Sequence, residues 1–128
     1  MVLIDVREEN GWLSSGWNLT YPAGWTNICK AVSSVFDFYA DPEVLVGGER
    51  ISVSDKDEIL ALEENSKMTI RGMSTIINCP LMITFYNQLQ VVEVTLPCMA
   101  DEFKEADYKQ FNLSLGQYMD SIELAMHR

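Results

Sequence analysis

Short apolar runs separated by turn residues fill the middle of this chain, and they constrain its fold more than any other feature. Gly47-Gly48 lies between two such runs, at residues 44–46 and 50–53. Asn87-Gln88 lies between a second pair, at residues 81–86 and 89–96. Two turn residues between two β-prone runs are typical of a hairpin, and the Gly pair suits the turn better than Asn-Gln. The sequence therefore predicts an antiparallel β-meander.

Residues 67–71 read Lys-Met-Thr-Ile-Arg, so Met68 and Ile70 are expected to face the core from one side of a pleated strand. Residues 81–86 are more apolar and are expected at the centre of the sheet. Residues 54–65 fit either a helix capped by Ser54 or a strand paired with residues 67–71, and we favour the strand.

One amphipathic helix is predicted ahead of the meander. Its apolar positions recur at helical spacing and form one stripe: Trp25, Ile28, Val32, Val35, Phe36 and Tyr39. The opposite positions are polar or small, and Asp41-Pro42 is expected to end the helix. Such a helix is expected to cover one face of the sheet.

The two ends of the chain complete the expected fold. An apolar run at residues 2–6 precedes a loop predicted over Asn10 to Gly24. Asp101 begins a possible short helix, and Ser114 with Gln117 forms a capping-box pattern ahead of a final helix. The predicted fold class is α+β, one domain over residues 1–128, with an antiparallel β-meander packed against an N-terminal amphipathic helix and a C-terminal helix.

The charge of the chain limits its partners. Asp and Glu number 19 and Lys and Arg number 9, giving a net charge of −10. Such a chain is repelled by phosphate backbones and anionic lipid, so we expect no direct binding to nucleic acid or membrane. Three cysteines with wide spacing indicate free thiols, and no signal peptide or long apolar span is present. We therefore expect a soluble, cytoplasmic protein; its oligomeric state is left open.

Most catalytic classes lack their residues here. The single histidine, His127, lies one residue from the end, so a Ser-His-Asp relay, a Cys-His relay and a His-rich metal site are excluded. Glycine-rich nucleotide fingerprints are missing too, and we expect no cofactor and no metal. Paired carboxylates remain open, and Glu93 is the first candidate, because it interrupts the apolar run 91–94 and faces either solvent or a pocket.

The acids are unevenly distributed. Residues 37–64 contain nine acids against two bases, and residues 101–107 hold a second cluster. Gathered at one edge, the first cluster would form a negative patch for a basic protein, or simply a solvated face. Its candidate partner-binding residues are Asp55, Asp57, Glu58, Glu63 and Glu64.

Aromatic residues give a second candidate surface. Trp12, Trp17, Tyr21 and Trp25 lie within fourteen residues. Tryptophan on a loop is common among binding hot spots, but it also pins loops to a core. Trp12 and Trp17 are the candidate partner-binding aromatics, whereas Trp25 belongs to the helix stripe.

Small size, strong acidity, an α+β fold and the lack of catalytic histidine form a profile. It resembles the immunity proteins that bacteria make against polymorphic or contact-dependent toxins, which are commonly small acidic α+β domains that bind a basic nuclease toxin and block its active site. The resemblance implies a non-catalytic inhibitor of a basic protein partner such as a toxin domain. Two alternatives stay open: a small enzyme or ligand-binding domain with a pocket between helix and sheet that uses Glu93 or Tyr86, and a phage-type inhibitor that mimics DNA.

Overall fold

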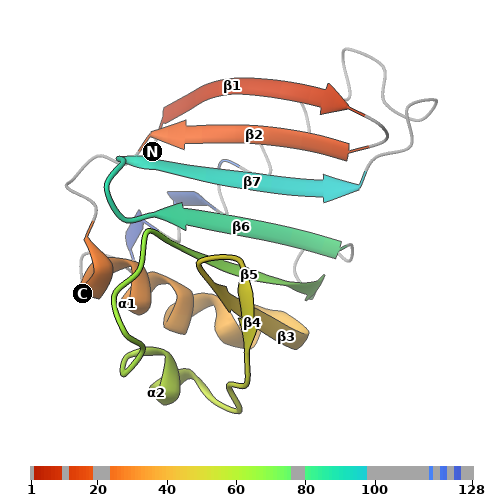
Figure 1. Ribbon diagram of the computed structural model, residues 1–128. Helices are drawn as coiled ribbons and strands as arrows, with labels where there is room; N and C mark the ends of the chain where they lie inside the picture. Colours follow the sequence, from red (N-terminus) through yellow and green to blue (C-terminus); the bar gives the residue numbers. More distant parts are fainter. Residues whose placement is uncertain are drawn as a thin grey trace.

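The computed structural model of the protein describes residues 2–9, 12–18, 24–75 and 80–97, together with residues 116, 119, 120, 123 and 124. Over these residues it is an α+β fold built on one antiparallel sheet (Figure 1). The elements in chain order are β1 (Val2–Glu9), β2 (Trp12–Asn18), α1 (Trp25–Val35), the 3-10 turn η1 (Phe36–Phe38), β3 (Tyr39–Val46), β4 (Glu49–Ile51), α2 (Lys56–Ile59), β5 (Lys67–Ser74), β6 (Pro80–Tyr86) and β7 (Val91–Pro97).

The sheet has six long strands and the three-residue β4, in the order β1-β2-β7-β6-β5-β3-β4. Strands β5, β6 and β7 form the predicted meander, and β6 is central as expected. The hairpin through Gly47-Gly48 is confirmed, because Val46 pairs with Glu49 and both glycines have positive φ, as a tight two-residue turn requires. The β6–β7 hairpin is also present, but four residues, 87–90, link its strands rather than two.

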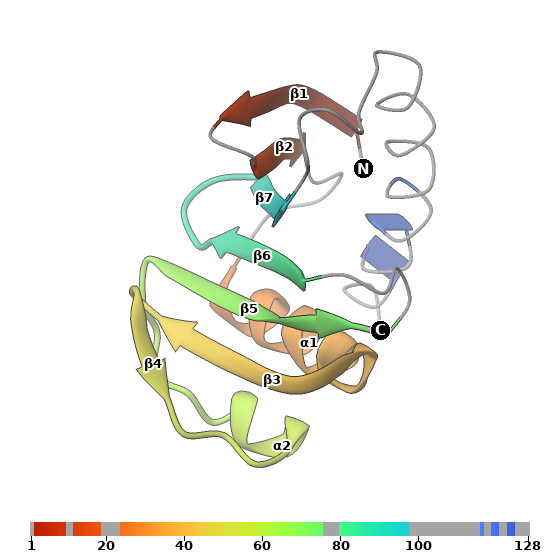
Figure 2. The ribbon, with the colours of Figure 1, turned by 90° about the vertical axis from the view of Figure 1, so that its right-hand side faces the viewer.

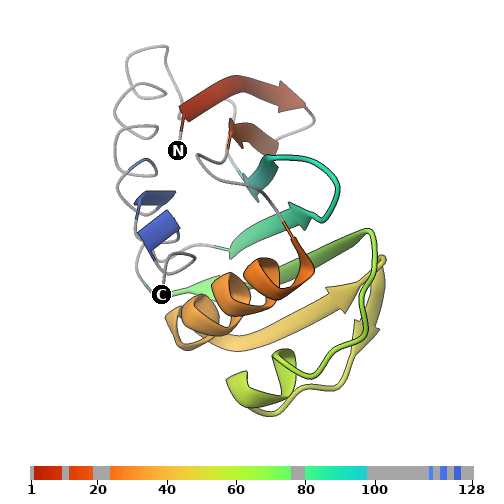
Figure 3. The ribbon, with the colours of Figure 1, turned by 90° about the vertical axis from the view of Figure 1, so that its left-hand side faces the viewer.

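Helix α1 lies against one face of the sheet, behind β5 and β3 in Figure 1 and beside them in Figures 2 and 3. Its side chains Ile28, Val32 and Val35 belong to the same buried cluster as the inward side chains of the strands. Met68 and Ile70 are fully buried, as their alternation predicts. We call the other side, which no described helix covers, the open face.

Several predicted boundaries are wrong. The helix ends at Val35 and η1, not at Asp41-Pro42, and that pair lies inside β3, where the register with β5 shifts between Ala40 and Glu43. Tyr39 is buried as expected, but from the start of a strand. Its chain segment has β-prone residues and a pairing partner in β5, so sheet formation overrides the helical spacing.

The loop predicted over Asn10 to Gly24 is also wrong in part, because residues 12–18 form strand β2. Ser14, Ser15 and Gly16 have low strand propensity, but β2 is paired on both sides, with β1 and β7, and this pairing decides its conformation. The predicted helices at residues 101–106 and 114–126 lie outside the described residues except at isolated positions; of these, Met119 is fully buried in the core.

The strand favoured for residues 54–65 is wrong as well, and the helical alternative is partly right. Asp55, not Ser54, caps the four-residue helix α2. Ile59 is the inward anchor of this helix and is fully buried, whereas Leu60 beside it is 52% exposed. The strand was expected to pair with residues 67–71, but β5 is already paired on both sides, with β3 and β6, so no sheet edge is open to it there.

This neighbouring pair gives a stability test. Ile59→Ala should lower the free energy of unfolding by about 2–5 kcal/mol, because it leaves a cavity in the core. Leu60→Ala should change it by about 0.5 kcal/mol or less, since an exposed side chain loses few contacts. Urea denaturation of both variants measures the difference, and equal losses would show that α2 is not anchored through Ile59.

A second test concerns Cys29, which is buried in α1 as a free thiol. Burial raises the pKa of Cys29 to about 11 from an ordinary value of 9.0. The folded protein should therefore hold this thiol protonated and protected at pH 8, and iodoacetamide should label it only after denaturation. Peptide mass mapping reads Cys29 separately from the other cysteines. The stability that its burial contributes should fade between about pH 9 and 11, because the unfolded thiol ionises first.

Candidate functional site

The acidic segment, residues 54–66, connects β4 to β5 and carries all five of the predicted partner-binding acids. Those five carboxylates are exposed, and the segment contains a single base, Lys56. Five negative charges against one positive charge leave the segment at −4. The exposed Lys56 also lies 3.5 Å from Asp37, a pair worth little in free energy at such exposure. These five acids therefore lie exposed along one continuous segment.

Three of these acids hold the segment in shape. Asp55 Oδ1 accepts hydrogen bonds from the backbone N–H groups of Asp57, at 2.9 Å, and Glu58, at 3.2 Å, which caps α2. Glu58 in turn accepts from the hydroxyl and the backbone N–H of Ser54. Glu64 accepts from Asn87 Nδ2 at 3.0 Å, which ties the segment to the β6–β7 loop.

Two further hydrogen bonds fasten the segment to α1. Trp25 Nε1 donates to the carbonyl of Leu62 at 2.9 Å, and Ser33 Oγ donates to the carbonyl of Lys56 at 3.1 Å. Together with the buried Ile59, they attach both the beginning and the end of the acidic segment to the helix. The segment is thus a positioned surface and not a loose tail.

Asp57 and Glu63 stand apart, because neither carboxylate has a hydrogen bond or ion pair to any other residue that the structure describes. Between them in sequence lies Leu60, an exposed apolar side chain surrounded along the chain by acids. Sequence reasoning missed Leu60. The apolar pair Ile59-Leu60 inside an acidic stretch was the available signal, but only the fold shows which of the two points outward.

The structure separates the two predicted tryptophans. Trp17 is 5% exposed, and its Nε1 donates to Ser15 Oγ at 3.0 Å inside the core. It offers almost no surface to a partner, so the prediction that Trp17 is an exposed partner-binding residue is wrong. Trp12 is 49% exposed. It lies on β2, at the end of the sheet away from α2 in all three ribbon views, so it does not join the acidic segment. The second acidic cluster, residues 101–107, lies outside the described residues.

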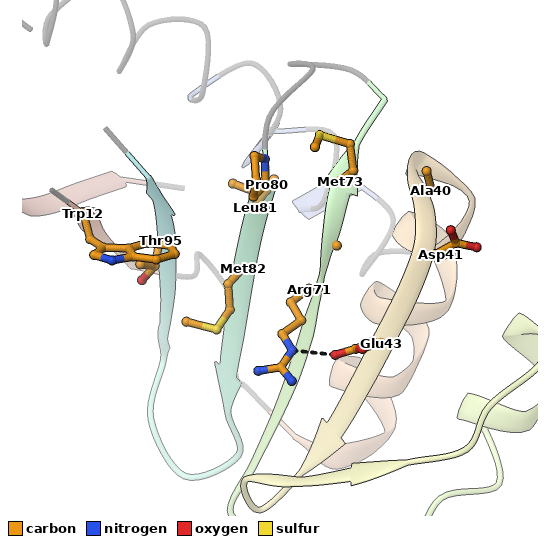
Figure 4. Close-up of a pocket in the computed structure, with 11 residues that line it drawn as sticks. Trp12, Ala40, Asp41, Glu43, Arg71, Met73, Pro80, Leu81, Met82 and Thr95 are labelled. Carbon is orange, nitrogen blue, oxygen red and sulfur yellow. Dashed lines mark hydrogen bonds and ion pairs between the residues drawn. The ribbon is translucent and has the colours of Figure 1, made fainter. Parts of the chain in front are cut away.

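Trp12 instead borders a groove on the open face, with a volume of about 620 Å³ (Figure 4). Most of its lining is apolar. The groove residues are Trp12, Ala40, Asp41, Glu43, Arg71, Gly72, Met73, Pro80, Leu81, Met82 and Thr95. The ligand-site alternative placed a pocket between helix and sheet, whereas this groove lies on the sheet face away from α1.

A group of charges closes one end of the groove. Arg71 Nε donates to Glu43 Oε2 at 2.8 Å, and Arg50 Nη2 lies 3.5 Å from the other oxygen of Glu43. The hydrogen bond from Arg71 lowers the pKa of Glu43 below its ordinary value, and the charges of Arg50 and Arg71 act in the same direction. Arg71 and Arg50 balance the carboxylates of Glu43 and Asp41, which also lines the groove, so this end is formally neutral and offers guanidinium donors beside the paired Glu43.

The backbone beside the groove is unusual. Asp41 has a φ of 50°, the left-handed region that non-glycine residues seldom adopt, at the point where the register of β3 shifts. Opposite lies Gly72, with a φ of 157°, and a Cβ there would come within 3.2 Å of the carbonyl oxygen of Ala40. This irregularity brings the β3 backbone close to β5 at the groove wall.

Glu93 and Tyr86, the residues of the enzyme alternative, do not line this groove. Glu93 lies on the open face of β7, half-buried, with Arg7 Nη2 3.4 Å from its carboxylate. Burial first and the charge of Glu93 second raise the pKa of Tyr86, and Arg7 lowers it. This direction is opposite to the lowering of the pKa that would activate a tyrosine as a base.

Within the described part of the chain, no three His, Cys, Asp or Glu side chains gather in a way that could hold a metal ion. None of the helices described there has the length and apolar character to cross a membrane. Comparison of the chain with protein-family models, curated proteins and solved structures gave no match.

The groove wall gives a third prediction. Gly72→Ala should destabilise the fold by about 1–3 kcal/mol, because the new Cβ meets backbone atoms and the φ disfavours a side chain. Gly24→Ala is the matched control, since its nearest contact, Asn27 Nδ2, is 3.8 Å away. Thermal denaturation compares them, and an unaffected Gly72→Ala protein would mean that β3 and β5 are less tightly held there.

Proposed function

We propose that this protein is a non-catalytic binding protein, and that it neutralises a basic protein partner, such as a nuclease toxin, as immunity proteins do. The acidic segment, residues 54–66, is the proposed binding surface. The observation that carries the proposal is the exposed Leu60 between two unpaired carboxylates, Asp57 and Glu63, on a segment of net charge −4.

The composition of this surface suits a basic partner. Long-range attraction to Lys and Arg speeds the encounter. Exposed carboxylates also stay hydrated in the free protein, so they carry no desolvation cost before the partner binds. Leu60 adds an apolar anchor, which interfaces need because charges at a rim contribute more to the rate of association than to affinity. Asp57, Leu60 and Glu63 are therefore the proposed contacts.

The remaining acids have a different proposed role. Asp55, Glu58 and Glu64 already accept hydrogen bonds from within the fold, so they shape the surface and add to its field. A segment that is ordered before binding loses less conformational entropy on association. DNA mimicry is less well supported, because it would need carboxylates in regular, freely presented rows and three of these five are engaged within the fold.

Co-expression tests the proposal directly. The product of the neighbouring gene, expressed alone, should arrest growth, and this chain should restore growth and co-purify with it. A neighbour that is harmless and does not bind would contradict the inhibitor function.

Matched variants then locate the surface. Leu60→Ala should weaken binding by about tenfold or more, as truncation of a central anchor does, whereas Ile4→Ala, similarly exposed at 55% on β1 at the far edge of the sheet, should change it less than twofold. Glu63→Gln should slow association more than Glu93→Gln, although both remove one negative charge. Surface plasmon resonance at low and high salt measures both rates; equal effects of each pair would move the interface elsewhere.

A further inference from the structure

The groove on the open face is built from cross-strand neighbours. Thr95 pairs with Met82, Met82 with Arg71, and Arg71 with Glu43, so one row of side chains crosses β7, β6, β5 and β3. Met73 pairs with Pro80 and Ala40 in the adjacent row. Strands in a sheet lie about 4.8 Å apart, so the groove extends about 19 Å from β2, with Trp12, to β3.

Polarity changes along the groove. At the β2 end the indole of Trp12 lies over the β7 strand beside Thr95, and Met82 extends toward it in Figure 4. Met73, 46% exposed, and Pro80 continue this apolar surface. Exposed indole and thioether groups are costly in water and adapt well to an apolar ligand.

The opposite end offers hydrogen-bond donors. Arg71 donates its Nε–H to Glu43. Its two Nη groups have no hydrogen bond to any other residue in the described part of the chain. Glu43 is already paired with Arg71 and Arg50, and Asp41 points away from the guanidinium in Figure 4. A protein of net charge −10 therefore presents free cationic donors at this end.

We propose that this groove binds a small amphiphilic carboxylate, with its apolar body across Trp12, Met82 and Met73 and its carboxylate hydrogen-bonded to the Nη groups of Arg71. The volume, about 620 Å³, is in the range of small-ligand sites, and a mainly apolar lining with a few polar groups that set orientation is their usual composition. A planar guanidinium matches a carboxylate better than an ammonium would.

The site is independent of the proposed protein-binding surface. Trp12 lies on β2 and Met82 on β6, whereas the acidic segment contains α2, which lies at the other end of the molecule from β2. A variant that loses the ligand should keep the partner, and Leu60→Ala should keep the ligand. Failure of one proposal is thus distinguishable from failure of the other.

Isothermal titration calorimetry with decanoate, below the concentration at which it forms micelles, tests the site. Decanoate should bind with one-to-one stoichiometry. Acetate, which has the head alone, and decyltrimethylammonium, which has the same apolar body and the opposite charge, should bind at least tenfold more weakly. No binding of decanoate, or tighter binding of the cation, would overturn the proposal.

Substitutions on one strand separate the specific contact from general charge. Arg71→Gln should weaken decanoate binding about tenfold or more, whereas Lys67→Gln, which removes the same charge from the same face of β5, should change it less than twofold. Trp12→Ala should weaken binding without altering the preference for the anion. Circular dichroism checks each fold, and Arg71→Lys, which keeps the charge but loses the planar donor pair, replaces Arg71→Gln if that variant unfolds. Equal effects at Arg71 and Lys67 would overturn the assignment.

Discussion

The contact between α1 and one face of the sheet supports everything else in this structure. Ile28, Val32 and Val35 from the helix share a buried cluster with inward side chains such as Ile83 and Phe85 from the central strand. Side chains alternate along a strand, so when every second side chain packs into this cluster, the side chains between them point to the open face. The same contact therefore creates the core and determines which residues remain available for binding.

The positions of both candidate surfaces follow from the packing of α1 against one face of the sheet. The acidic segment is held to the helix side by Ile59, which enters the core, and by Trp25, which donates to the backbone of Leu62. The groove lies on the opposite face, where Arg71 and Met82 are cross-strand neighbours. Because side chains alternate along a strand, both point away from the core. A chain of strong net negative charge thus carries an acidic segment and, on its open face, a groove where Arg71 and Arg50 balance the carboxylates beside them.

The candidate site was predictable in part. Clustered acids in the sequence indicated an exposed segment, and all five of its acids are exposed, since charged side chains seldom lie inside a protein. Their individual roles were not visible, because Asp55 as a helix cap and Asp57 as an unpaired carboxylate have the same chemistry and differ only in what surrounds them. Trp17 and Trp12 show the same limit: similar glycine- and serine-rich surroundings place one in the core and the other at the groove.

Sequence alone determined the elements whose signal is local: the Gly47-Gly48 turn, the alternation through Met68 and Ile70, the amphipathic stripe of α1 and the excess of acids. Tertiary structure decided the rest. Residues 12–18 form a strand because pairing on both sides outweighs their weak strand propensity. Residues 56–59 form a short helix whose Ile59 side chain is buried in the core. Tertiary structure alone assembled the groove, since Trp12, Arg71 and Thr95 come from strands far apart in the chain and meet only through long-range pairing.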